Sequence, residues 1–565
     1  MCMILYLQMY TMMFERGKNM KILIVGGVAA GTKCAAKLKR ELGDSAEVKV
    51  ITLGSYISYA GCGLPYYIGK VIKDKESLLE NTPQSFSELT GAEVITGIEA
   101  TRLDRAAKQV YARNAATGEE LVYPYDKLVI ATGARPVMPK LPGIELGNIF
   151  SLRDPDDADA IKAAVASGEV KRAVIVGGGA IGLEMAENLT GLGIRASVID
   201  MAPHVLPGYD GDFAGFVEDQ LAEHGIPVFL GDSVTGFEGE GKVQKLRTAK
   251  RAIKTDMVIM SVGVRPNTEW LADSGLNFVE GTRILDVDEH MRTNDEDVYA
   301  IGDCAMVKSL ITGKNTWTPM GSTANITGRA CAKAIAGTAT HGFRGVLSTN
   351  VLKLPGTNVG KAGLGIESAK AAGLDVEHVT ITCYDKAKFY PDMEHFSIRL
   401  VADKQSRKLL GVQVLGKGTV DKIVDIGVTA ISLGATIDAF DDMDLAYSPP
   451  FSSVIHPFAI AAEALENKMD GKLDGDTFEA LNTGDDWILL DVGKTPVVPT
   501  LRHVDVGSIN GPVKDIPLDA KVALICLEGK NSYMAQNRMV RYGYTNVKVV
   551  EGGTMFNTSL KVDVE

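Results

Sequence analysis

A single cysteine, Cys62, lies between two glycines in the stretch SYAGCGLPYYIG, residues 58–69. The stretch follows a strand-like run and precedes Pro65, so we expect Cys62 where a loop enters a helix. Helix-terminal N–H groups and the positive end of the helix dipole favour a thiolate there, and the thiolate is the nucleophile. No second cysteine follows closely, so disulfide chemistry at Cys62 would use a mixed disulfide, a persulfide or a sulfenic acid. The alternative interpretation is a small buried apolar side chain.

The composition is that of a globular protein with several domains. The chain has 565 residues, of which 45% are hydrophobic and 23% charged, and this length favours three to four domains. Seven cysteines without paired spacing predict no disulfide scaffold and a reducing, cytoplasmic location. A net charge of −12 does not favour nucleic-acid binding, and no apolar run is long enough for a membrane span. We expect no metal ion, and we expect residues 1–19 to be an unstructured extension before Met20.

The first motif is a strand, a glycine turn and a helix. KILIV at 21–25 is a predicted buried strand, and the turn GGVAAG that follows contains Gly26 and Gly31. Such a turn places the pyrophosphate of a dinucleotide on helix N–H groups. Two positions depart from the usual pattern: Val28 replaces the middle glycine, and Thr52 stands where an acidic residue would bind a ribose hydroxyl.

The same unit recurs at 173–200 with the full GxGxxG spacing. Gly177, Gly179 and Gly182 form the glycine turn, and Asp200 ends the second strand. Asp200 would accept hydrogen bonds from the ribose 2′-OH and repel a 2′-phosphate, which favours NADH over NADPH. A carboxylate at the surface end of a strand is the alternative interpretation for Asp200.

Three further segments accompany the two glycine turns. LVIATGARP at 128–136 is a predicted buried strand that turns back, and YAIGDCA at 299–305 is a strand that ends at Asp303. MVIMSVGVRPNTEWL at 257–271 repeats the strand-glycine-Arg-Pro pattern in the second unit. Because sequence that completes the first unit returns after the second, we expect a discontinuous first domain.

Together these motifs resemble the pyridine nucleotide-disulfide oxidoreductase superfamily, and residues 21 to about 465 resemble coenzyme A-disulfide reductase. The resemblance implies FAD on the first unit and NADH, or NADPH, on the second. It implies that Asp303 meets the FAD ribityl chain, that Cys62 faces the isoalloxazine, and that Thr132 and Gly133 contact a cofactor. The chain departs from the family at Gly61, where Asn usually precedes the cysteine, and at Thr52.

The resemblance also implies an α/β fold of several domains. It predicts a FAD-binding domain at 20–150 plus 272–344, an NAD-binding domain at 151–271 and an α+β dimerisation domain at 345–465, so that the protein is a homodimer. In the family two tyrosines of the last domain reach the partner's active site. The matching residues are Tyr390 and Tyr447, for which a general-acid role or a buried interface position are the two interpretations.

A short basic segment follows the first glycine turn. Lys37, Lys39 and Arg40 lie in KLKR on the predicted helix. The resemblance suggests that they hold the phosphates of coenzyme A, and a solvated helix face is the equal alternative.

Residues 472–565 form a separate small α/β unit with a predicted parallel sheet. The segments CLEGKNS, at 526–532, and HVDVGSIN resemble the active-site loop and a second segment of rhodanese, so the unit is expected to be rhodanese-like. In such a loop successive N–H groups stabilise a thiolate or persulfide at Cys526. Asn531 and Gly493 replace two arginines of that family, so a degenerate domain kept for interaction is the alternative.

The sequence therefore predicts an FAD-dependent NADH oxidoreductase that reduces coenzyme A disulfide, coenzyme A persulfide or polysulfide at Cys62, with a sulfurtransferase-like domain attached. One alternative is an NADH oxidase in which Cys62 cycles through sulfenic acid. A peroxidase is disfavoured because the first glycine turn contains no histidine. A redox-sensing or sulfur-carrier protein is an alternative of another class.

Overall fold

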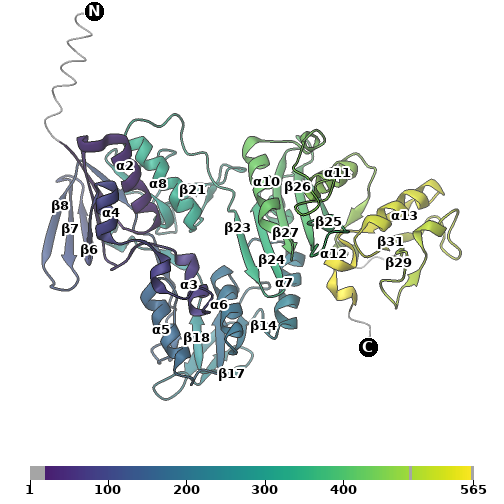
Figure 1. Ribbon diagram of the computed structural model, residues 1–565, viewed down its shortest axis with the longest axis horizontal. Coiled ribbons are helices and arrows are strands. Elements are labelled where there is room, and N and C mark those ends of the chain that lie inside the picture. The colour runs from purple at the N-terminus through teal and green to yellow at the C-terminus, as the bar shows by residue number, and fades with distance from the viewer. Residues whose placement is uncertain (1–18, 483–486, 562–565) are drawn as a thin grey trace, which may run out of the picture.

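The structure is a computed structural model that describes residues 19–482 and 487–561. Two nucleotide-binding domains, an antiparallel α+β domain and a small C-terminal α/β domain make up these residues (Figure 1). The predicted α/β fold class is confirmed, whereas the extension predicted at 1–19 lies outside the described residues except for Asn19. Within the described ranges no helix is long and apolar enough to cross a membrane, and no cluster of side chains could hold a metal ion.

The first domain is built on a five-stranded parallel sheet with the order β20-β9-β1-β2-β5. These strands are β1 (Met20–Val25), β2 (Ala46–Thr52), β5 (Glu93–Thr96), β9 (Lys127–Ile130) and β20 (Val298–Ala300). Successive strand residues face opposite sides. Ile22 and Ile24 therefore pack on helices α2 (Ala29–Leu42) and α8 (Gly321–Ile335), which cover one face. The opposite face packs on an antiparallel sheet of β6 (Ile98–Asp104), β7 (Gln109–Asn114) and β8 (Glu120–Pro124).

The second domain repeats this arrangement with the strand order β11-β18-β12-β13-β14. Its parallel strands are β11 (Ile149–Phe150), β12 (Arg172–Val176), β13 (Arg195–Ile199), β14 (Val228–Phe229) and β18 (Met257–Met260). Its helices are α5 (Pro155–Ala166), α6 (Ala180–Gly191) and α7 (Gly211–Glu223), and its antiparallel sheet contains β15 (Val234–Glu238), β16 (Lys245–Thr248) and β17 (Ala252–Lys254). The repeated Arg-Pro segments of the two domains pair with each other as β10 (Ala134–Pro136) and β19 (Val264–Pro266).

The third domain carries a five-stranded antiparallel sheet with the order β23-β24-β27-β26-β25. Its strands are β23 (Asn350–Leu354), β24 (Thr357–Gly363), β25 (Val376–Tyr384), β26 (His395–Asp403) and β27 (Leu409–Gly416). Helices α10 (Val420–Leu433) and α11 (Pro457–Met469) bury their apolar sides against this sheet, and α9 (Ile366–Ala371) packs at its edge.

The C-terminal domain has a parallel sheet with the order β28-β32-β31-β29-β30. Its elements are β28 (Gly475–Asp476), α12 (Phe478–Asn482), β29 (Ile488–Asp491), β30 (Arg502–His503), β31 (Lys521–Ile525), α13 (Lys530–Arg541), β32 (Asn546–Val550) and α14 (Gly553–Phe556). The three strands predicted from the sequence are β29, β31 and β32, and two short edge strands were missed.

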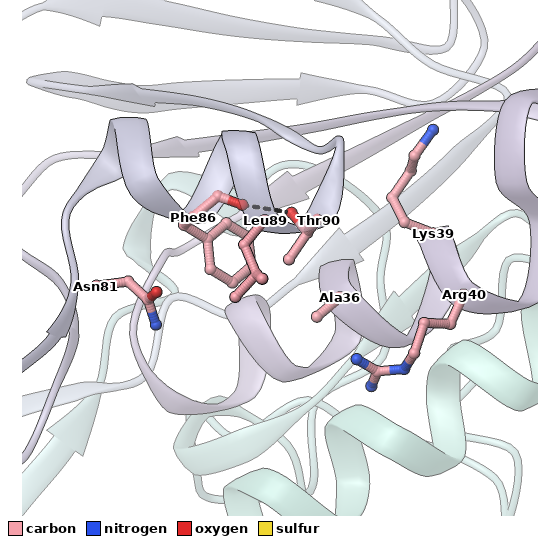
Figure 2. A pocket seen from close by; sticks show the side chains of 7 residues that line it. All are labelled: Ala36, Lys39, Arg40, Asn81, Phe86, Leu89 and Thr90. Carbon is pink, nitrogen blue, oxygen red and sulfur yellow. Dashed lines mark hydrogen bonds between the residues drawn. The ribbon is translucent and has the colours of Figure 1, made fainter.

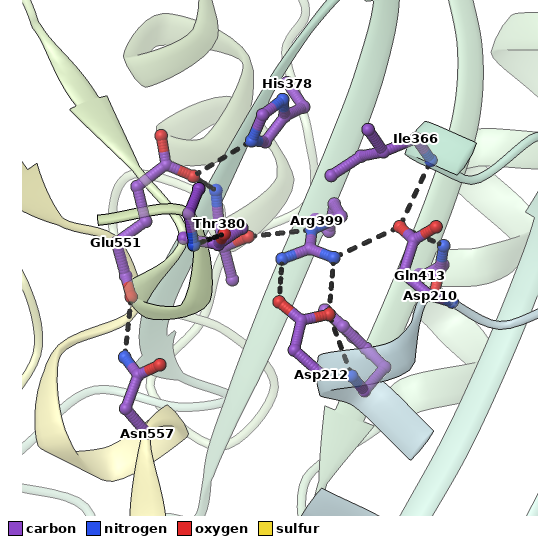
Figure 3. Close-up of polar contacts among 12 residues, drawn as sticks. Asp210, Asp212, Ile366, His378, Thr380, Arg399, Gln413, Glu551 and Asn557 are labelled. Atoms are coloured by element: carbon purple, nitrogen blue, oxygen red, sulfur yellow. Dashed lines mark hydrogen bonds and ion pairs between the residues drawn. The ribbon is translucent and has the colours of Figure 1, made fainter. Parts of the chain in front are cut away.

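A buried polar network joins the C-terminal, antiparallel and second domains (Figure 3). Arg399 on β26 has a side chain that is 1% exposed, and it pairs with Asp210 at 3.1 Å and with Asp212 at the start of α7. Arg399 Nε also donates to Thr380 Oγ1 at 2.9 Å, and the Thr380 N–H donates to the Glu551 carboxylate at 2.8 Å. Glu551 follows β32, so the network holds three domains in one arrangement.

The first prediction concerns this network. We expect Arg399→Met to lower the free energy of unfolding by about 3–5 kcal/mol, because it leaves two carboxylates unpaired in a buried position. Thermal or denaturant unfolding measures the loss. Arg113→Met is the matched control: the Arg113–Glu99 side chains are 50% and 39% exposed, so it should cost less than about 1 kcal/mol. Equal losses for the two variants would contradict the prediction.

Candidate active site

The first glycine turn brings β1, β9 and α2 together with no room for side chains. A Cβ atom at Gly26, where φ is +116°, would lie 2.1 Å from the Ala131 carbonyl oxygen. A Cβ atom at Gly31 would lie 1.8 Å from the Gly26 carbonyl oxygen. Val28 occupies the residue before α2, with a φ of −100° that any side chain adopts, which explains why valine is tolerated there.

The second glycine turn has the same geometry between β12 and α6. Gly177 and Gly182 approach backbone oxygens closely, whereas a Cβ atom at Gly179 would meet nothing within 4 Å. A backbone with open space beside a helix N-terminus can accept a pyrophosphate. Asp200, after β13, accepts hydrogen bonds from the N–H groups of Gly178 at 2.7 Å and Ala202 at 2.8 Å. Asp200 therefore also shapes the turn, a role that sequence reasoning missed.

The loop after β9 is tied to the segment after β19. Thr132 Oγ1 donates to the Asn267 carbonyl at 2.8 Å, and Asn267 Nδ2 donates to the Thr132 carbonyl at 3.0 Å. Gly133 has a φ of +64°, a left-handed conformation that favours glycine. Thr132 and Gly133 are thus held at the carboxyl edge of the first sheet, next to the contact between the two nucleotide-binding domains.

Asp303 lies in the turn that follows β20, with a side chain that is 12% exposed. Its carboxylate pairs with Arg153 Nη2 at 3.2 Å. Burial raises the pKa of Asp303, and the Arg153 charge opposes that effect. Arg153 was not predicted as a site residue, because its surroundings in the sequence, RDPDD, signal only the capped start of helix α5.

Cys62 lies in the short turn Gly61–Gly63, directly before helix α3 (Leu64–Ile68), as the sequence predicted. The expected preference for the thiolate is not found in the polypeptide. Surrounding protein atoms limit the hydration of the sulfur and raise the pKa of Cys62 although the residue is exposed at the surface; the charge of Glu184 raises that pKa further, and Arg153 opposes both effects. Helix α3 has only five residues, so the dipole at its N-terminus is small.

Glu184 on α6 is a second residue that sequence reasoning missed. Tyr66 Oη on α3 donates to Glu184 Oε1 at 3.2 Å. Burial raises the pKa of Glu184 to about 7, and the Tyr66 hydrogen bond opposes the rise. Glu184 follows Gly182 by two residues, so its place in the glycine fingerprint was the available signal.

The tyrosines of the antiparallel domain lie at its surface. Tyr390 is half-buried in the loop between β25 and β26, and Tyr447 is 45% exposed in the segment before α11. Within the described ranges no hydrogen bond joins either tyrosine to Cys62 of the same chain. Their predicted reach into a partner's site stays a prediction.

The three basic residues of α2 differ in their contacts. Lys37 forms an ion pair with Glu41, one turn along the helix. Lys39 Nζ donates to the Gly43 carbonyl at 2.9 Å and to the Ala46 carbonyl at 3.3 Å. Arg40 has no ion-pair partner among the residues that the structure describes.

Cys526 follows strand β31 and is 2% exposed. The Gly529 N–H, just before α13, donates to Cys526 Sγ at 3.2 Å. Gly493 occupies a tight position, since its N–H donates to Asp491 at 2.9 Å and its carbonyl lies 2.9 Å from His503 Nε2. The loop thus directs one backbone N–H at the sulfur, where successive N–H groups were predicted, and it has no arginine at position 493 or 531.

Comparison with known proteins decides the family. The model "Pyridine nucleotide-disulphide oxidoreductase" matches residues 20–325, and the model of its dimerisation domain matches residues 354–458. The chain belongs to this family. It is therefore an NAD(P)H-dependent flavoprotein reductase, and residues 354–458 are a dimerisation domain.

Two relatives of similar sequence identity are named for different activities. The chain is 33% identical over 453 residues to the NAD(P)H coenzyme A polysulfide/persulfide reductase of Pyrococcus horikoshii, covering 80% of this chain and 100% of the relative. It is 32% identical over 454 residues to the NADH oxidase of Methanocaldococcus jannaschii, again covering 80% of this chain and 100% of the relative. The family is thus shared by persulfide-reducing and oxidase relatives at equal similarity.

Two solved structures extend over the C-terminal domain as well. Reduced CoADR-RHD of Bacillus anthracis superposes with a TM-score of 0.91 at 32% identity, covering 96% of this chain and 98% of that one. An NAD-dependent persulfide reductase of A. fulgidus superposes with a TM-score of 0.89 at 34% identity, covering 95% of this chain and 100% of that one. The four-domain arrangement is therefore shared with these proteins.

The residues of the flavoprotein reductase fit the cofactors of its family. At Gly26 and Gly31 the turn has no room for side chains, so only backbone atoms lie at the start of α2. A helix N-terminus of this kind is a position at which a pyrophosphate can bind. Asp303 offers a buried carboxylate at the end of β20 as an acceptor for hydroxyl groups. The open space at Gly179 suits the nicotinamide dinucleotide in the second domain.

The second prediction concerns the effect of the Glu184 charge on the pKa of the Cys62 thiol. We expect Glu184→Gln to lower the pKa of Cys62 by about half a unit to one unit, because it removes a charge that disfavours the thiolate. The difference in Cys62 reactivity between the variant and the unchanged protein should disappear below pH 7, because Glu184 itself has a pKa of about 7 and is uncharged in acid. The pH dependence of Cys62 alkylation, followed on its peptide by mass spectrometry, measures the shift.

Glu169→Gln is the control for this measurement, because the Glu169–Lys242 pair is exposed and lies in another part of the domain. A Cys62 midpoint that stays unchanged or rises in Glu184→Gln would show that Glu184 does not govern the thiol.

Proposed function

We propose that the protein is a homodimeric NADH-dependent reductase of coenzyme A persulfide, coenzyme A disulfide or polysulfide that works through Cys62. The observation that carries the proposal is that Cys62 is the only exposed cysteine in the part of the chain that the structure describes. The thiols of Cys34, Cys304, Cys331, Cys383 and Cys526 are buried. Among the described residues no second exposed thiol is therefore available to Cys62, which supports a mechanism in which the sulfur of a substrate takes the place of a second cysteine.

The reaction begins when the Cys62 thiolate attacks the S–S bond of the substrate. With coenzyme A disulfide, a new S–S bond joins Cys62 to one coenzyme A and the other leaves as a thiolate. With coenzyme A persulfide, attack on the coenzyme A sulfur releases hydrosulfide. FAD held by the first domain would supply the two electrons, drawn from NADH, that reduce this mixed disulfide. Cys62 is then left as the thiolate, and coenzyme A leaves as the thiol after one proton is taken up.

The surroundings of Cys62 supply protons and orientation. Tyr66 and Glu184 form a hydrogen-bonded pair close to the thiol, and a carboxyl with a pKa of about 7 can give or take a proton near neutral pH. Tyr390 and Tyr447 of a partner subunit are the further proposed acids. Arg153 and Asp303 form an ion pair, and both of their charges act on the Cys62 thiol.

A cavity beside α2 suits coenzyme A (Figure 2). It has a volume of about 410 Å³ and is lined by Ala36, Lys39, Arg40, Asn81, Phe86, Leu89 and Thr90. The exposed Leu89 offers apolar surface for a base, and Arg40 lines the cavity without an ion-pair partner among the described residues. An unpaired guanidinium is suited to bidentate phosphate binding. Lys37 is less suited, because Glu41 already neutralises it.

The preference for NADH rests on Asp200. Its carboxylate is held by two backbone N–H groups at the end of β13 and would repel the 2′-phosphate of NADPH.

The homodimer is supported by apolar surface on the dimerisation domain. Its exposed large side chains are Leu433, Met443, Tyr447, Phe451, Val454 and Ile455. An exposed apolar patch of this kind is typical of a protein interface.

The C-terminal domain is proposed to be rhodanese-like and to carry sulfane sulfur as a Cys526 persulfide. The support is the position of Cys526 between a parallel strand and a helix N-terminus, with the Gly529 N–H on its sulfur. A domain kept for interaction alone is the second candidate, supported by Gly493 and Asn531 in place of arginines.

An NADH oxidase is the second candidate for the main activity, because a relative of equal similarity has that name. In that reaction Cys62 would pass through a sulfenic acid, which the absence of a nearby second cysteine also allows.

The third prediction tests the acceptor. Under anaerobic conditions the FAD-loaded protein should consume NADH with coenzyme A persulfide, and Cys62→Ser should lower the rate by at least about a hundredfold. Cys383→Ala, which removes a buried thiol of the dimerisation domain, is the control. NADH oxidation only in air would instead favour the oxidase, and flavin reduction without turnover would favour a sensor.

The fourth prediction tests the coenzyme A cavity. We expect Arg40→Met to raise the KM for coenzyme A persulfide about tenfold, the loss of one charge-assisted contact, while the KM for inorganic polysulfide stays the same. Lys37→Met should have a smaller effect, because Glu41 already pairs with Lys37. Equal changes for both acceptors in steady-state kinetics would place coenzyme A elsewhere.

A further inference from the structure

The Cys526 loop is attached to the dimerisation domain through the side chain of Glu528. Tyr384 Oη donates to Glu528 Oε1 at 2.7 Å, and Lys388 Nζ lies 2.9 Å and 3.2 Å from the two carboxylate oxygens. The Lys388 ammonium also lies over the Tyr384 ring, 4.4 Å from its centroid. The Glu528 side chain is only 18% exposed, so this cluster is partly shielded from water.

Tyr384 stays a hydrogen-bond donor throughout the physiological pH range. Burial raises its pKa to about 12, and the hydrogen bond to Glu528 raises it as well. Glu528 therefore has a neutral donor and a cation on the same carboxylate. Both come from one stretch of chain, the end of β25 and the loop that follows it.

From Glu528 the contact continues along the backbone to the Cys526 sulfur. The next residue, Gly529, has a φ of +96° and donates its N–H to Cys526 Sγ at 3.2 Å. The direction of that N–H depends on the peptide that joins Glu528 to Gly529. The other end of the loop is held within its own domain, where the Thr554 N–H donates to the Cys526 carbonyl at 2.9 Å. The Glu528 end is bound to the dimerisation domain directly, through its own side chain.

We propose that Glu528 is a positioning residue for Cys526: its contacts with Tyr384 and Lys388 hold the Gly529 N–H on the sulfur and thereby favour the thiolate. A hydrogen bond to the charged form stabilises that form. The dimerisation domain thus controls the reactivity of a cysteine in the neighbouring domain. The loop that carries Lys388 also carries Tyr390, the tyrosine proposed to act at the Cys62 site of a partner subunit.

The inference rests on the proposed role of Cys526 as a carrier of sulfane sulfur. In that step the Cys526 thiolate attacks the outer sulfur of a persulfide, RS–SH. The RS–S bond breaks, a new S–S bond gives the Cys526 persulfide, and RS⁻ leaves with no net oxidation. Only the thiolate performs this attack, so a higher pKa at Cys526 slows it near neutral pH.

The test is the pH midpoint of Cys526 alkylation by iodoacetamide, measured on its peptide in the full-length, FAD-loaded protein. In Tyr384→Phe/Lys388→Met we expect the midpoint to rise by about one pH unit, a tenfold slower reaction at pH values below it. Lys386→Met is the matched control, because Lys386 lies in the same loop and donates to the Asp392 carbonyl instead. Cys62 in the same sample should keep its own midpoint.

Glu528→Ala separates positioning from a direct charge effect. Removal of a negative charge would by itself lower the Cys526 midpoint, whereas loss of the positioned N–H raises it. A raised midpoint supports the proposal, and an unchanged or lowered midpoint overturns it. Tyr384→Phe alone is the milder variant if thermal unfolding shows that a substitution disrupts the domain. Because ionisation is measured and turnover is not, failure here is distinct from failure of the proposed reduction.

Discussion

Direct contact between backbone segments, with no side chain between them, determines where the cofactors and the reactive cysteine can lie. At Gly26 and Gly31 the strands β1 and β9 and the start of α2 approach so closely that any Cβ atom would overlap a carbonyl oxygen. The second domain repeats this constraint at Gly177 and Gly182. Each turn precedes a helix N-terminus, the kind of position at which backbone N–H groups can bind a pyrophosphate.

The charges around Cys62 oppose one another. Arg153 favours the thiolate and is itself paired with Asp303, while Glu184 and burial favour the thiol. Because Glu184, whose pKa is about 7, contributes to this balance, the pKa of the Cys62 thiol is coupled to pH in the neutral range. This balance belongs to the folded domains, because Arg153 and Glu184 come from segments far from Cys62 in the sequence.

The C-terminal domain is held in place by polar contacts at two points. Glu551 and Arg399 connect it through β25 and β26 to the start of α7, and Glu528 connects the Cys526 loop to the end of β25. Charges that are buried must be paired, so domain separation would expose several unpaired groups at once. The position of Cys526 relative to the dimerisation domain is therefore a fixed property of the folded chain.

The sequence by itself determined the order of the domains, both glycine turns, the turn that presents Cys62 and the strand-loop-helix at Cys526. These are local patterns, in which glycine spacing and strand periodicity directly express backbone geometry. Only the tertiary structure decided which distant groups surround them: Arg153 and Glu184 at Cys62, the pairing of Lys37 with Glu41, and Glu528 on Tyr384. The pKa of Cys62 could not be predicted from its loop, because burial and the charges of residues distant in the sequence act on it.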